Sequence, residues 1–226
     1  SLNLRNSIFV DITASDMVAS SYALYLKQSI AVVACNKIAC SSKIENYLEL
    51  KQLSHKYNVP FLFETNVGAG LPVIDTLKHL INSGDKINTV HAVLSGSLNY
   101  IFNNYNKSTT FHDVVKQAQT EGYTEPDPRI DLSGVDVARK LLILARESGE
   151  MIDMNGIENE AFLPEECMTA NSVEAFYETL KSKEVHFQKF FTSAESNQCQ
   201  LKYVSEYKDG VAKVGLKEIP EGHPFY

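Results

Sequence analysis

The sequence lacks any cluster of positive charge. No run of Lys or Arg is longer than two residues, and the 226 residues carry a net charge of −7 at pH 7 with an isoelectric point near 5.4. Nucleic acids and anionic membranes bind proteins through a basic stripe or patch, which this chain does not offer. The sequence therefore predicts neither a nucleic-acid partner nor a membrane partner.

Long apolar runs are also missing. No uninterrupted apolar stretch approaches the roughly 20 residues of a membrane span, and residues 1–20 do not have the basic and apolar regions of a secretory signal. Hydrophobic residues still make up 44% of the chain, which is enough for a substantial core. We predict a soluble, cytoplasmic protein.

Cysteine is scarce, with four residues at positions 35, 40, 167 and 199. They form neither a disulfide framework nor a zinc pattern, because no second ligand pair follows Cys35 and Cys40 at finger-like spacing. Plain buried thiols are the favoured interpretation, and reduced thiols are expected in the cytoplasm.

The first part of the chain alternates short apolar runs with helical patterns. Three strands with two helices between them are predicted, at residues 7–12, 15–28, 30–34, 43–57 and 59–63. This alternation is typical of parallel β-α-β units in a doubly wound sheet, where the loops at the carboxyl ends of the strands carry the chemistry. Those loops are residues 13–15, 36–37 and 64–70.

A glycine-rich phosphate-binding turn is absent. A dinucleotide-binding fold normally begins with a strand and a G-x-G-x-x-G turn, whose backbone amides and helix dipole bind the pyrophosphate. No such turn occurs in the 226 residues. We therefore expect residues 1–72 to be the second half of a Rossmann-type sheet that lacks its first β-α-β unit, in an α/β protein.

The pattern changes after about residue 72. Helices are predicted at residues 72–83, 98–105, 110–121 and 133–149, and strands at 87–94, 200–207 and 211–219. The last two strands flank an Asp209-Gly210 turn, which favours a hairpin. We predict an α+β catalytic and dimerisation domain over residues 73–226, whose edge strand 87–94 invites pairing in a homodimer. Residues 151–185 give no decisive pattern.

Charged residues are concentrated in the segment Gly122–Lys140, GYTEPDPRIDLSGVDVARK. Its two prolines stiffen the loop, so that carboxylates can be presented without a large ordering cost. In the following helix, Asp136, Lys140 and Glu147 project onto one narrow polar stripe beside a broad apolar face. One interpretation is that Asp136 and Lys140 form an active-site pair. The spacing alone favours an ordinary ion pair between Asp136 and Lys140, with a capping box at Ser133.

Two turns that follow strands could hold ligands. Glu64 precedes the turn Asn66–Pro72, where its carboxylate and several backbone carbonyls could bind a hard cation. A glycine turn beside a solvated glutamate is an equal alternative. The segment Ser95–Tyr100 can offer hydrogen bonds from Gly96 and Ser97, and by itself it also fits a helix N-cap.

Three segments together resemble the homoserine dehydrogenase family: ETNVGAGLPVI at Glu64–Ile74, LSGSLNYIF at Leu94–Phe102 and GYTEPDPRIDLSGVDVARKLLILAR at Gly122–Arg146. They are most similar to the dehydrogenase half of bifunctional aspartokinase–homoserine dehydrogenases. The resemblance implies an NAD(P)-dependent oxidoreductase that interconverts L-aspartate 4-semialdehyde and L-homoserine in threonine, methionine and isoleucine biosynthesis. It also implies an aspartokinase upstream in a longer polypeptide.

The resemblance implies roles for individual residues. Lys140 is implied as the proton donor and acceptor at the substrate oxygen, acting with Lys37 and Asp136. The implied substrate contacts are Glu125, at the amino end of the substrate, and Asp131, Tyr123, Gly96 and Ser97. The implied cofactor contacts are Thr13, Ala14, Ser15, Asn36 and Lys37. A sodium or potassium ion is implied at Glu64 and the carbonyls of Val67, Ala69 and Leu71.

The chain departs from the family in three respects. It lacks the N-terminal glycine-rich unit, it stops before a C-terminal glycine-rich stretch that returns to the nicotinamide pocket, and it has Ile130-Asp131 where the family usually has two acids. Two alternatives therefore stay open: a non-catalytic dimerisation fragment of the same enzyme, and a different two-domain semialdehyde or sugar-acid dehydrogenase. The residue that distinguishes NAD from NADP would lie in the missing unit.

Overall fold

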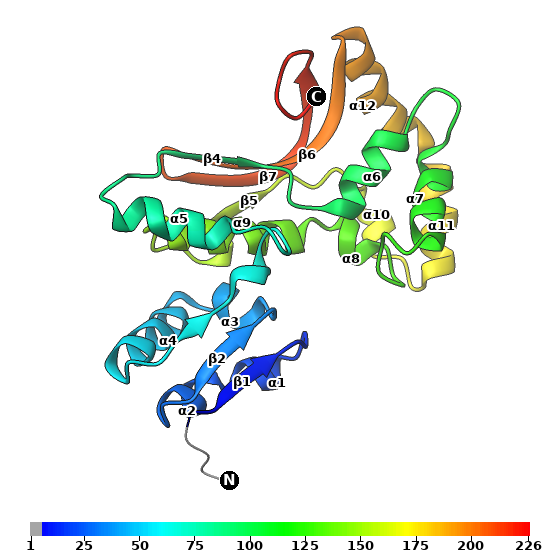
Figure 1. Cartoon of the computed structure of the whole chain (residues 1–226). Helices are drawn as coiled ribbons and strands as arrows, with labels where there is room; N and C mark the ends of the chain where they lie inside the picture. The colour runs from blue at the N-terminus through cyan, green and yellow to red at the C-terminus, as the bar shows by residue number, and fades with distance from the viewer. Residues whose placement is uncertain (1–5) are drawn as a thin grey trace. The chain divides into compact units, whose positions relative to one another are not determined.

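The computed structural model describes residues 6–226, which divide into two compact units (Figure 1). The first unit comprises the described residues up to Val90, together with Arg139–Ile157 and Lys208–Ala212. The second comprises His91–Ala138, Glu158–Tyr207 and Lys213–Tyr226. The boundary at residue 72 stays a prediction about functional domains, since the compact units follow other bounds.

A parallel sheet forms the centre of the first unit. Its strands are β1 (Ile8–Asp11), β2 (Ala31–Ala34) and β3 (Phe61–Leu62), in the order β1-β2-β3. The connecting helices are α1 (Asp16–Ala19), α2 (Tyr22–Leu26), α3 (Ile38–Ser41) and α4 (Ile44–Lys56). The predicted parallel β-α-β arrangement is confirmed.

The region expected to form one helix at residues 15–28 contains two helices, α1 and α2. Between them, the hydroxyls of Ser20 and Ser21 donate hydrogen bonds of 2.9 and 2.6 Å to the carbonyls of Met17 and Val18. Such side-chain bonds compete with the helical backbone ladder, so the chain breaks there. The sequence did not predict α3 either.

Aromatic side chains fill the core beside this sheet. The Phe9 ring stacks on Tyr25 with centroids 4.1 Å apart. The Phe61 ring lies 5.9 Å from that of Tyr22 and 4.9 Å from that of Phe63. After β3 the chain forms a 3-10 turn, η1 (Glu64–Asn66), and helix α5 (Val73–Asn82).

Helix α9 (Val135–Glu147) brings a buried guanidinium into the first unit. Arg146, which is 3% exposed, donates from Nη1 to the Cys40 carbonyl at 2.8 Å and from Nη2 to Asp153 Oδ1 at 3.0 Å. Its guanidinium carbon lies 5.2 Å from the centre of the Tyr47 ring. One side chain thus links the end of α9 to α3 and α4.

The neighbouring Glu147 is buried as well, although the sequence placed it on the polar stripe. Its carboxylate accepts hydrogen bonds from the Tyr47 hydroxyl and from Lys51 Nζ, the latter at 3.0 Å, and Lys78 Nζ lies 3.8 Å away. A buried carboxylate is tolerated where such donors surround it. The periodicity of one helix cannot reveal donors that come from α4 and α5.

The second sheet lies mainly in the second unit, with strand order β4-β6-β7-β5. Its strands are β4 (Thr89–Ala92), β5 (Ile157–Asn159), β6 (Cys199–Lys208) and β7 (Val211–Pro220). At the β6–β7 turn, Asp209 and Gly210 both have positive φ, of 51° and 81°, as a tight two-residue hairpin turn requires. The predicted hairpin is confirmed.

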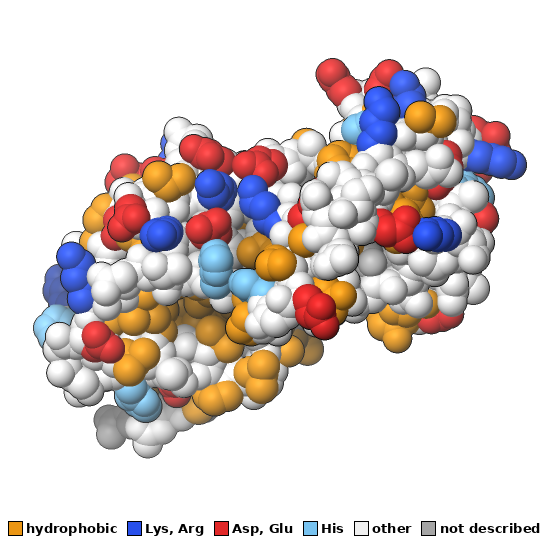
Figure 2. Space-filling view, turned by 90° about the horizontal axis from the view of Figure 1, so that it is seen from above, with side chains coloured by type: hydrophobic (Ala, Val, Ile, Leu, Met, Phe, Trp, Pro, Cys, Tyr) orange, Lys and Arg blue, Asp and Glu red, His pale blue; other side chains and the backbone are white. Residues whose placement is uncertain are grey.

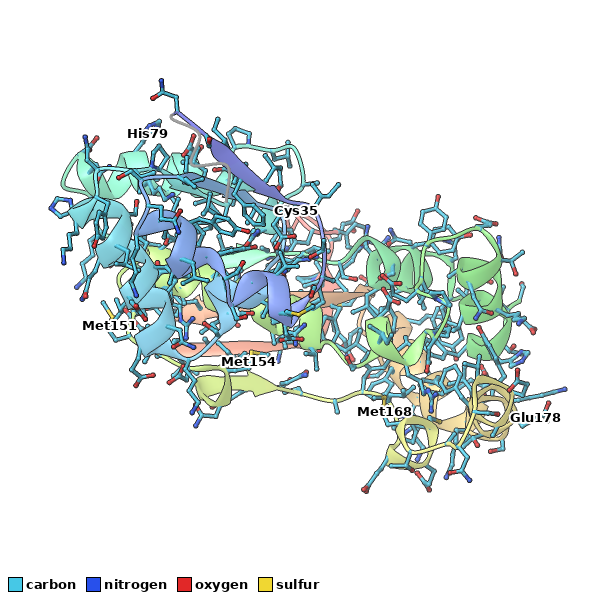
Figure 3. The ribbon with its side chains drawn as sticks, turned by 90° about the horizontal axis from the view of Figure 1, so that it is seen from below. Cys35, His79, Met151, Met154, Met168 and Glu178 are labelled. Atoms are coloured by element: carbon cyan, nitrogen blue, oxygen red, sulfur yellow. The ribbon has the colours of Figure 1, made fainter. Side chains whose placement is uncertain are left out.

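Short helices pack together in the rest of the second unit. They are α6 (Gly96–Asn104), α7 (Phe111–Thr120), α8 (Arg129–Leu132), α10 (Glu165–Met168), α11 (Val173–Ser182) and α12 (Glu184–Ser196). Helices α10 and α11, which carry Met168 and Glu178 (Figure 3), follow a 3-10 turn, η2 (Met154–Gly156), in the stretch that the sequence left undecided. The Phe111 ring is central: it stacks on Phe187 at 4.0 Å and meets the edge of Tyr105 at 5.4 Å.

Charges of both signs are mixed on the molecular face in Figure 2, where Lys and Arg lie among Asp and Glu rather than in one stripe. All four cysteines are free thiols, and those of Cys40 and Cys167 are buried. Across residues 6–226, no helix has the length and hydrophobicity needed to cross a membrane.

Gly134 separates α8 from α9 in the second unit, with φ at +71°. A Cβ atom there would lie 2.0 Å from the Tyr203 hydroxyl oxygen. Tyr203 cannot easily move, because it is 1% exposed and donates to Asn159 Oδ1 at 2.9 Å. Asn159 in turn donates to the Ser133 carbonyl at 2.9 Å. The turn into α9 therefore requires glycine.

We expect Glu147→Ala to lower the free energy of unfolding by about 3 kcal/mol, because a buried tyrosine hydroxyl and an ion pair both lose their acceptor. The control is Glu49→Ala on α4, the helix that also carries Tyr47 and Lys51; it removes an exposed ion pair with Lys27 (3.2 Å) and should change little. Urea denaturation measures both variants. Equal losses would contradict a special role for Glu147.

We expect Gly134→Ala to be more destabilising than Gly122→Ala by about 2 kcal/mol, the usual cost of overpacking a filled site. Both glycines have positive φ, but a Cβ at Gly122 meets nothing within 4 Å, so only backbone strain is shared. Adding Tyr203→Phe to Gly134→Ala should recover part of the loss. Chemical denaturation measures the free energy of unfolding of each variant. Equal stability of the two alanine variants would refute the clash with Tyr203.

Candidate active site

The loops after β1 and β2 meet at the carboxyl edge of the first sheet. Asn36 Nδ2 donates to the Ser15 carbonyl and to Asp11 Oδ2, both at 3.0 Å. The structure thus joins the segment Thr13–Ser15 to Asn36 and the adjoining Lys37, which is half-buried at the start of α3. These five residues are the ones that the family resemblance implied for the cofactor.

Asp11, which sequence reasoning missed, lies beneath these loops and is 1% exposed. Its Oδ1 accepts from Thr13 N at 2.7 Å, and its Oδ2 also accepts from the Tyr22 hydroxyl. Burial alone would raise the pKa of Asp11, but the hydrogen bonds from Tyr22, Thr13 and Asn36 together lower it below its ordinary value. The one signal in the sequence is that β1 and the stretch after β2 both end on polar residues, Asp11 and Asn36.

Glu64 caps helix α5. Its two oxygens accept hydrogen bonds of 2.8 Å from the backbone amides of Ile74 and Asp75, so the side chain is more than a solvated glutamate. In the turn between Glu64 and α5, Gly68 has a φ of +83°, and a Cβ there would lie 2.6 Å from Val73 Cγ2.

The same turn carries the backbone carbonyls implied for a cation, those of Val67, Ala69 and Leu71. A carboxylate has about four lone-pair positions, and the two amides of α5 use two of them. Glu64 therefore keeps acceptor positions for a further ligand while it caps α5. Carboxylate and carbonyl oxygens are the kinds of donor that hard cations prefer. The residues of the turn therefore fit such an ion.

A hydrogen-bonded chain in the second unit connects three of the implied substrate residues. Ser97 Oγ donates to Asp131 Oδ1 at 2.8 Å, and Asp131 Oδ2 accepts from Glu125 N at 2.8 Å. Ser95 caps α6 by accepting from Leu98 N at 3.1 Å, which leaves Ser97 for the contact with Asp131. The backbone of Glu125 is therefore fixed, while its side chain is exposed.

Tyr123 lies in the same loop and is held by a stacked ring. The Tyr100 and Tyr123 rings are 4.0 Å apart at 20°, and the Tyr100 hydroxyl donates to Glu121 Oε2 at 2.8 Å. That hydrogen bond raises the pKa of Tyr100 to about 12. Gly96, another implied contact, is the exposed first residue of α6. The sequence gave no indication of Tyr100 or Glu121.

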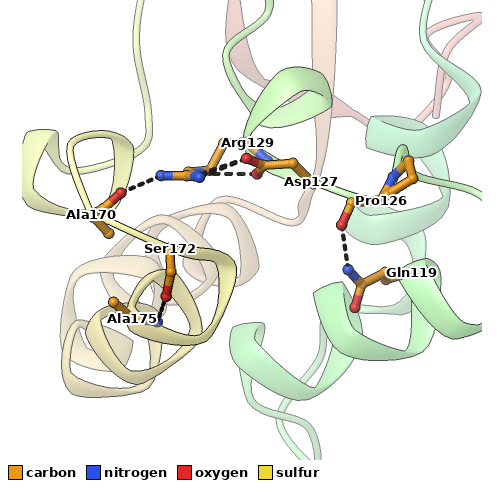
Figure 4. A network of polar contacts seen from close by, with 7 residues as sticks. All are labelled: Gln119, Pro126, Asp127, Arg129, Ala170, Ser172 and Ala175. Carbon is orange, nitrogen blue, oxygen red and sulfur yellow. Dashed lines mark hydrogen bonds and ion pairs between the residues drawn. The ribbon is translucent and has the colours of Figure 1, made fainter.

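Asp127 and Arg129 anchor the other side of this loop (Figure 4). Arg129 Nε and Nη2 donate to the two oxygens of Asp127 at 2.9 and 2.6 Å, and Nη1 donates to the Ala170 carbonyl before α11. The bond to Arg129 lowers the pKa of Asp127. Gln119 of α7 donates to the Pro126 carbonyl at 2.8 Å. The residues around Glu125 are thus tied to α7 and to the segment between α10 and α11.

Asp136 and Lys140 lie one turn apart on α9, and both are half-buried. The helix buries its opposite face, which includes Val137, Leu141 and Leu144. The shared polar face that the spacing predicts for the pair is therefore present. Ile130 is 57% exposed on α8 and precedes the hydrogen-bonded Asp131.

Residues 72–226 match the family model described as homoserine dehydrogenase. A relative in Zea mays, the chloroplastic bifunctional aspartokinase/homoserine dehydrogenase 1, is 42% identical over 223 residues, which cover 97% of this chain and 24% of that protein. This chain therefore spans only a small part of such relatives.

Two solved structures are similar to this one. A protein of unknown function from Candida auris has a TM-score of 0.92 and 34% identity, covering 98% of this chain and 64% of that one. A hyperthermophilic archaeal homoserine dehydrogenase in complex with NADPH has a TM-score of 0.70 and 25% identity, covering 96% of this chain and 57% of that one. The region matched by the family model is more than half of the chain and contains the Ser97–Asp131–Glu125 network and helix α9. The chain belongs to the homoserine dehydrogenase family.

Proposed function

We propose that this chain is the dehydrogenase part of an NAD(P)-dependent enzyme that interconverts L-aspartate 4-semialdehyde and L-homoserine, a step in threonine, methionine and isoleucine biosynthesis. The observation that carries the proposal is the hydrogen-bonded chain from Ser97 through Asp131 to the Glu125 backbone. It holds an exposed carboxylate in a fixed loop, which is what recognition of a substrate ammonium group requires.

The chemistry needs an acid at the aldehyde oxygen, where negative charge builds as the carbon is reduced. The bound nicotinamide supplies or accepts the hydride. Lys140 donates the proton to that oxygen, and it removes the proton in the reverse direction. Asp136, one turn earlier on α9, orients the lysine ammonium group.

Substrate orientation follows from charges of opposite sign. Glu125 binds the ammonium group of the amino acid, and Lys37 binds its carboxylate. Tyr123, Gly96 and Ser97 are proposed as further substrate contacts, and Asp131 fixes the loop that carries Glu125.

The cofactor is proposed to bind at the carboxyl edge of the first sheet, against Thr13–Ser15, Asn36 and Lys37, because such edges bind nucleotides in open α/β sheets. β1 is an edge strand within the described sheet, and its Ile8 and Val10 are 63% and 59% exposed. This supports the proposal that a further β-α-β unit with a glycine-rich turn belongs to a longer polypeptide. Because the matching Zea mays protein is bifunctional, an aspartokinase upstream is part of the same proposal.

Three further features complete the proposal. A sodium or potassium ion binds Glu64 and the carbonyls of the following turn. The enzyme is a homodimer, supported by the position of β4 at the edge of the second sheet. The free thiols agree with a reducing compartment such as the cytoplasm.

We expect Lys140→Ala to reduce homoserine oxidation by the complete enzyme by about 10²–10⁴-fold, the contribution of a general acid. The fold should persist, because the buried face of α9 is untouched. Arg139→Ala, an exposed neighbour on the same helix, is the control and should retain activity. The assay follows NAD(P)H absorbance, and circular dichroism checks folding. Normal turnover by a folded Lys140→Ala enzyme would disprove the assignment.

We expect Glu64→Ala to abolish the response of activity to sodium or potassium. It should also lower stability by about 1 kcal/mol, because the cap of α5 is lost. Asp75→Ala removes an exposed carboxylate from the same helix turn and should leave the cation response intact. Activity is titrated with each chloride salt at constant ionic strength. An unchanged response in Glu64→Ala would leave Glu64 with its capping role alone.

A further inference from the structure

Asp11 places a negative charge where the protein interior normally excludes one. It is the last residue of β1 and is 1% exposed. Burying a carboxylate costs several kcal/mol unless hydrogen bonds replace its lost hydration. The contacts of Asp11 therefore indicate why the charge is kept.

The hydrogen-bond donors to Asp11 come from three different elements. Thr13 N donates from the loop after β1 at 2.7 Å, and Asn36 Nδ2 donates from the loop after β2 at 3.0 Å. The Tyr22 hydroxyl donates from α2. An ionised carboxylate only accepts hydrogen bonds, so both of its oxygens can bind donors. A neutral amide at the same place would turn its own NH₂ group toward some of those donors.

Asn36 extends this connection to the next residues of both loops. Its second amide hydrogen is donated to the Ser15 carbonyl at 3.0 Å, and its Oδ1 accepts from Ile38 N at 3.0 Å. Both donor hydrogens of the side chain are thus used within the protein. Asn36 accordingly acts on a ligand by fixing the loops rather than by donating to it.

We propose that Asp11 is a positioning residue: it fixes the loops after β1 and β2, and through them the affinity for a nicotinamide cofactor, without touching the cofactor. The inference rests on the proposed function, because that function places the cofactor against Thr13–Ser15, Asn36 and Lys37. If Asp11 acted on stability alone, its loss would weaken the fold and leave cofactor affinity unchanged.

The isosteric substitution Asp11→Asn tests why a carboxylate is needed. Its new amide group replaces one of the two acceptor oxygens. On the Oδ1 side it would face the fixed Thr13 N–H, and on the Oδ2 side it would face the Asn36 amide hydrogen. In either orientation the new NH₂ group faces another donor, so one hydrogen bond to the loops is lost. The side-chain volume hardly changes.

In the complete enzyme, Asp11→Asn should raise the dissociation constant for NADPH about tenfold, which corresponds to the loss of one hydrogen bond to a charged group. Titration of NADPH fluorescence measures this without turnover, and NADH is titrated in parallel. The KM for the cofactor should rise in step, whereas kcat at saturating cofactor and homoserine should stay within about twofold.

Tyr22→Phe is the matched control, because it removes one donor to Asp11 and keeps both links to the loops. It should lower the Tm and leave the NADPH dissociation constant within about twofold, since no loop contact is lost. Asn36→Ala breaks the link between Asp11 and the Ser15 carbonyl, so it should weaken NADPH binding as Asp11→Asn does. If Asp11→Asn does not fold, Asn36→Ala still tests the proposal, because unchanged NADPH binding would show that the link between Asp11 and the loops does not set cofactor affinity.

The proposal is overturned if Asp11→Asn or Asn36→Ala is folded and binds NADPH as tightly as the unmodified enzyme. It is overturned equally if Tyr22→Phe weakens binding to the same extent, because stability would then explain every loss. An unmodified enzyme that binds NADPH but does not oxidise homoserine would refute the proposed function and leave the test of Asp11 intact. An unmodified enzyme that binds neither NADPH nor NADH refutes both.

Discussion

The first unit depends on the two buried charges at the end of α9. Arg146 reaches Cys40 and Asp153, and Glu147 reaches side chains of α4 and α5. Apolar packing would hold α9 against these helices without fixing how far it slides or turns, whereas directional hydrogen bonds fix both. Lys140 lies two turns before Glu147 on this rigid helix, so the buried pair also sets the position of the proposed catalytic lysine within the unit.

Two other buried or half-buried carboxylates organise the loops that carry the proposed site. Asp11 joins the loops of the first sheet, and Asp131 joins the start of α6 to the Glu125 loop. In each case the donors are neutral groups from separate elements. Each carboxylate is therefore satisfied by hydrogen-bond donors within the protein. Backbone segments that would otherwise move independently are ordered before a ligand arrives, which lowers the entropic cost of binding.

The sequence by itself determined the local features of the chain. Alternating apolar runs and helical periods were sufficient for the parallel strands β1 to β3 and for the β6–β7 hairpin, because each pattern lies within a few residues. The spacing of Asp136 and Lys140 likewise placed them on one helical face. The pattern gave a wrong result at Ser20 and Ser21. Their hydroxyls donate to backbone carbonyls one turn earlier, compete with the helical hydrogen bonds and divide the expected helix.

Only the tertiary structure decided which polar groups meet. Glu147 was placed on a polar stripe, yet its buried partner Tyr47 is 100 residues away. The sequence marks Asp11 only as a polar residue at the end of a strand and does not mark Tyr100 at all, because their roles depend on Asn36 and Tyr123 being brought beside them. Hydrophobic periodicity is set by the geometry of one element, so a sequence displays it directly. A buried hydrogen bond needs two elements packed at one separation and one angle, and that information exists only once the chain has folded.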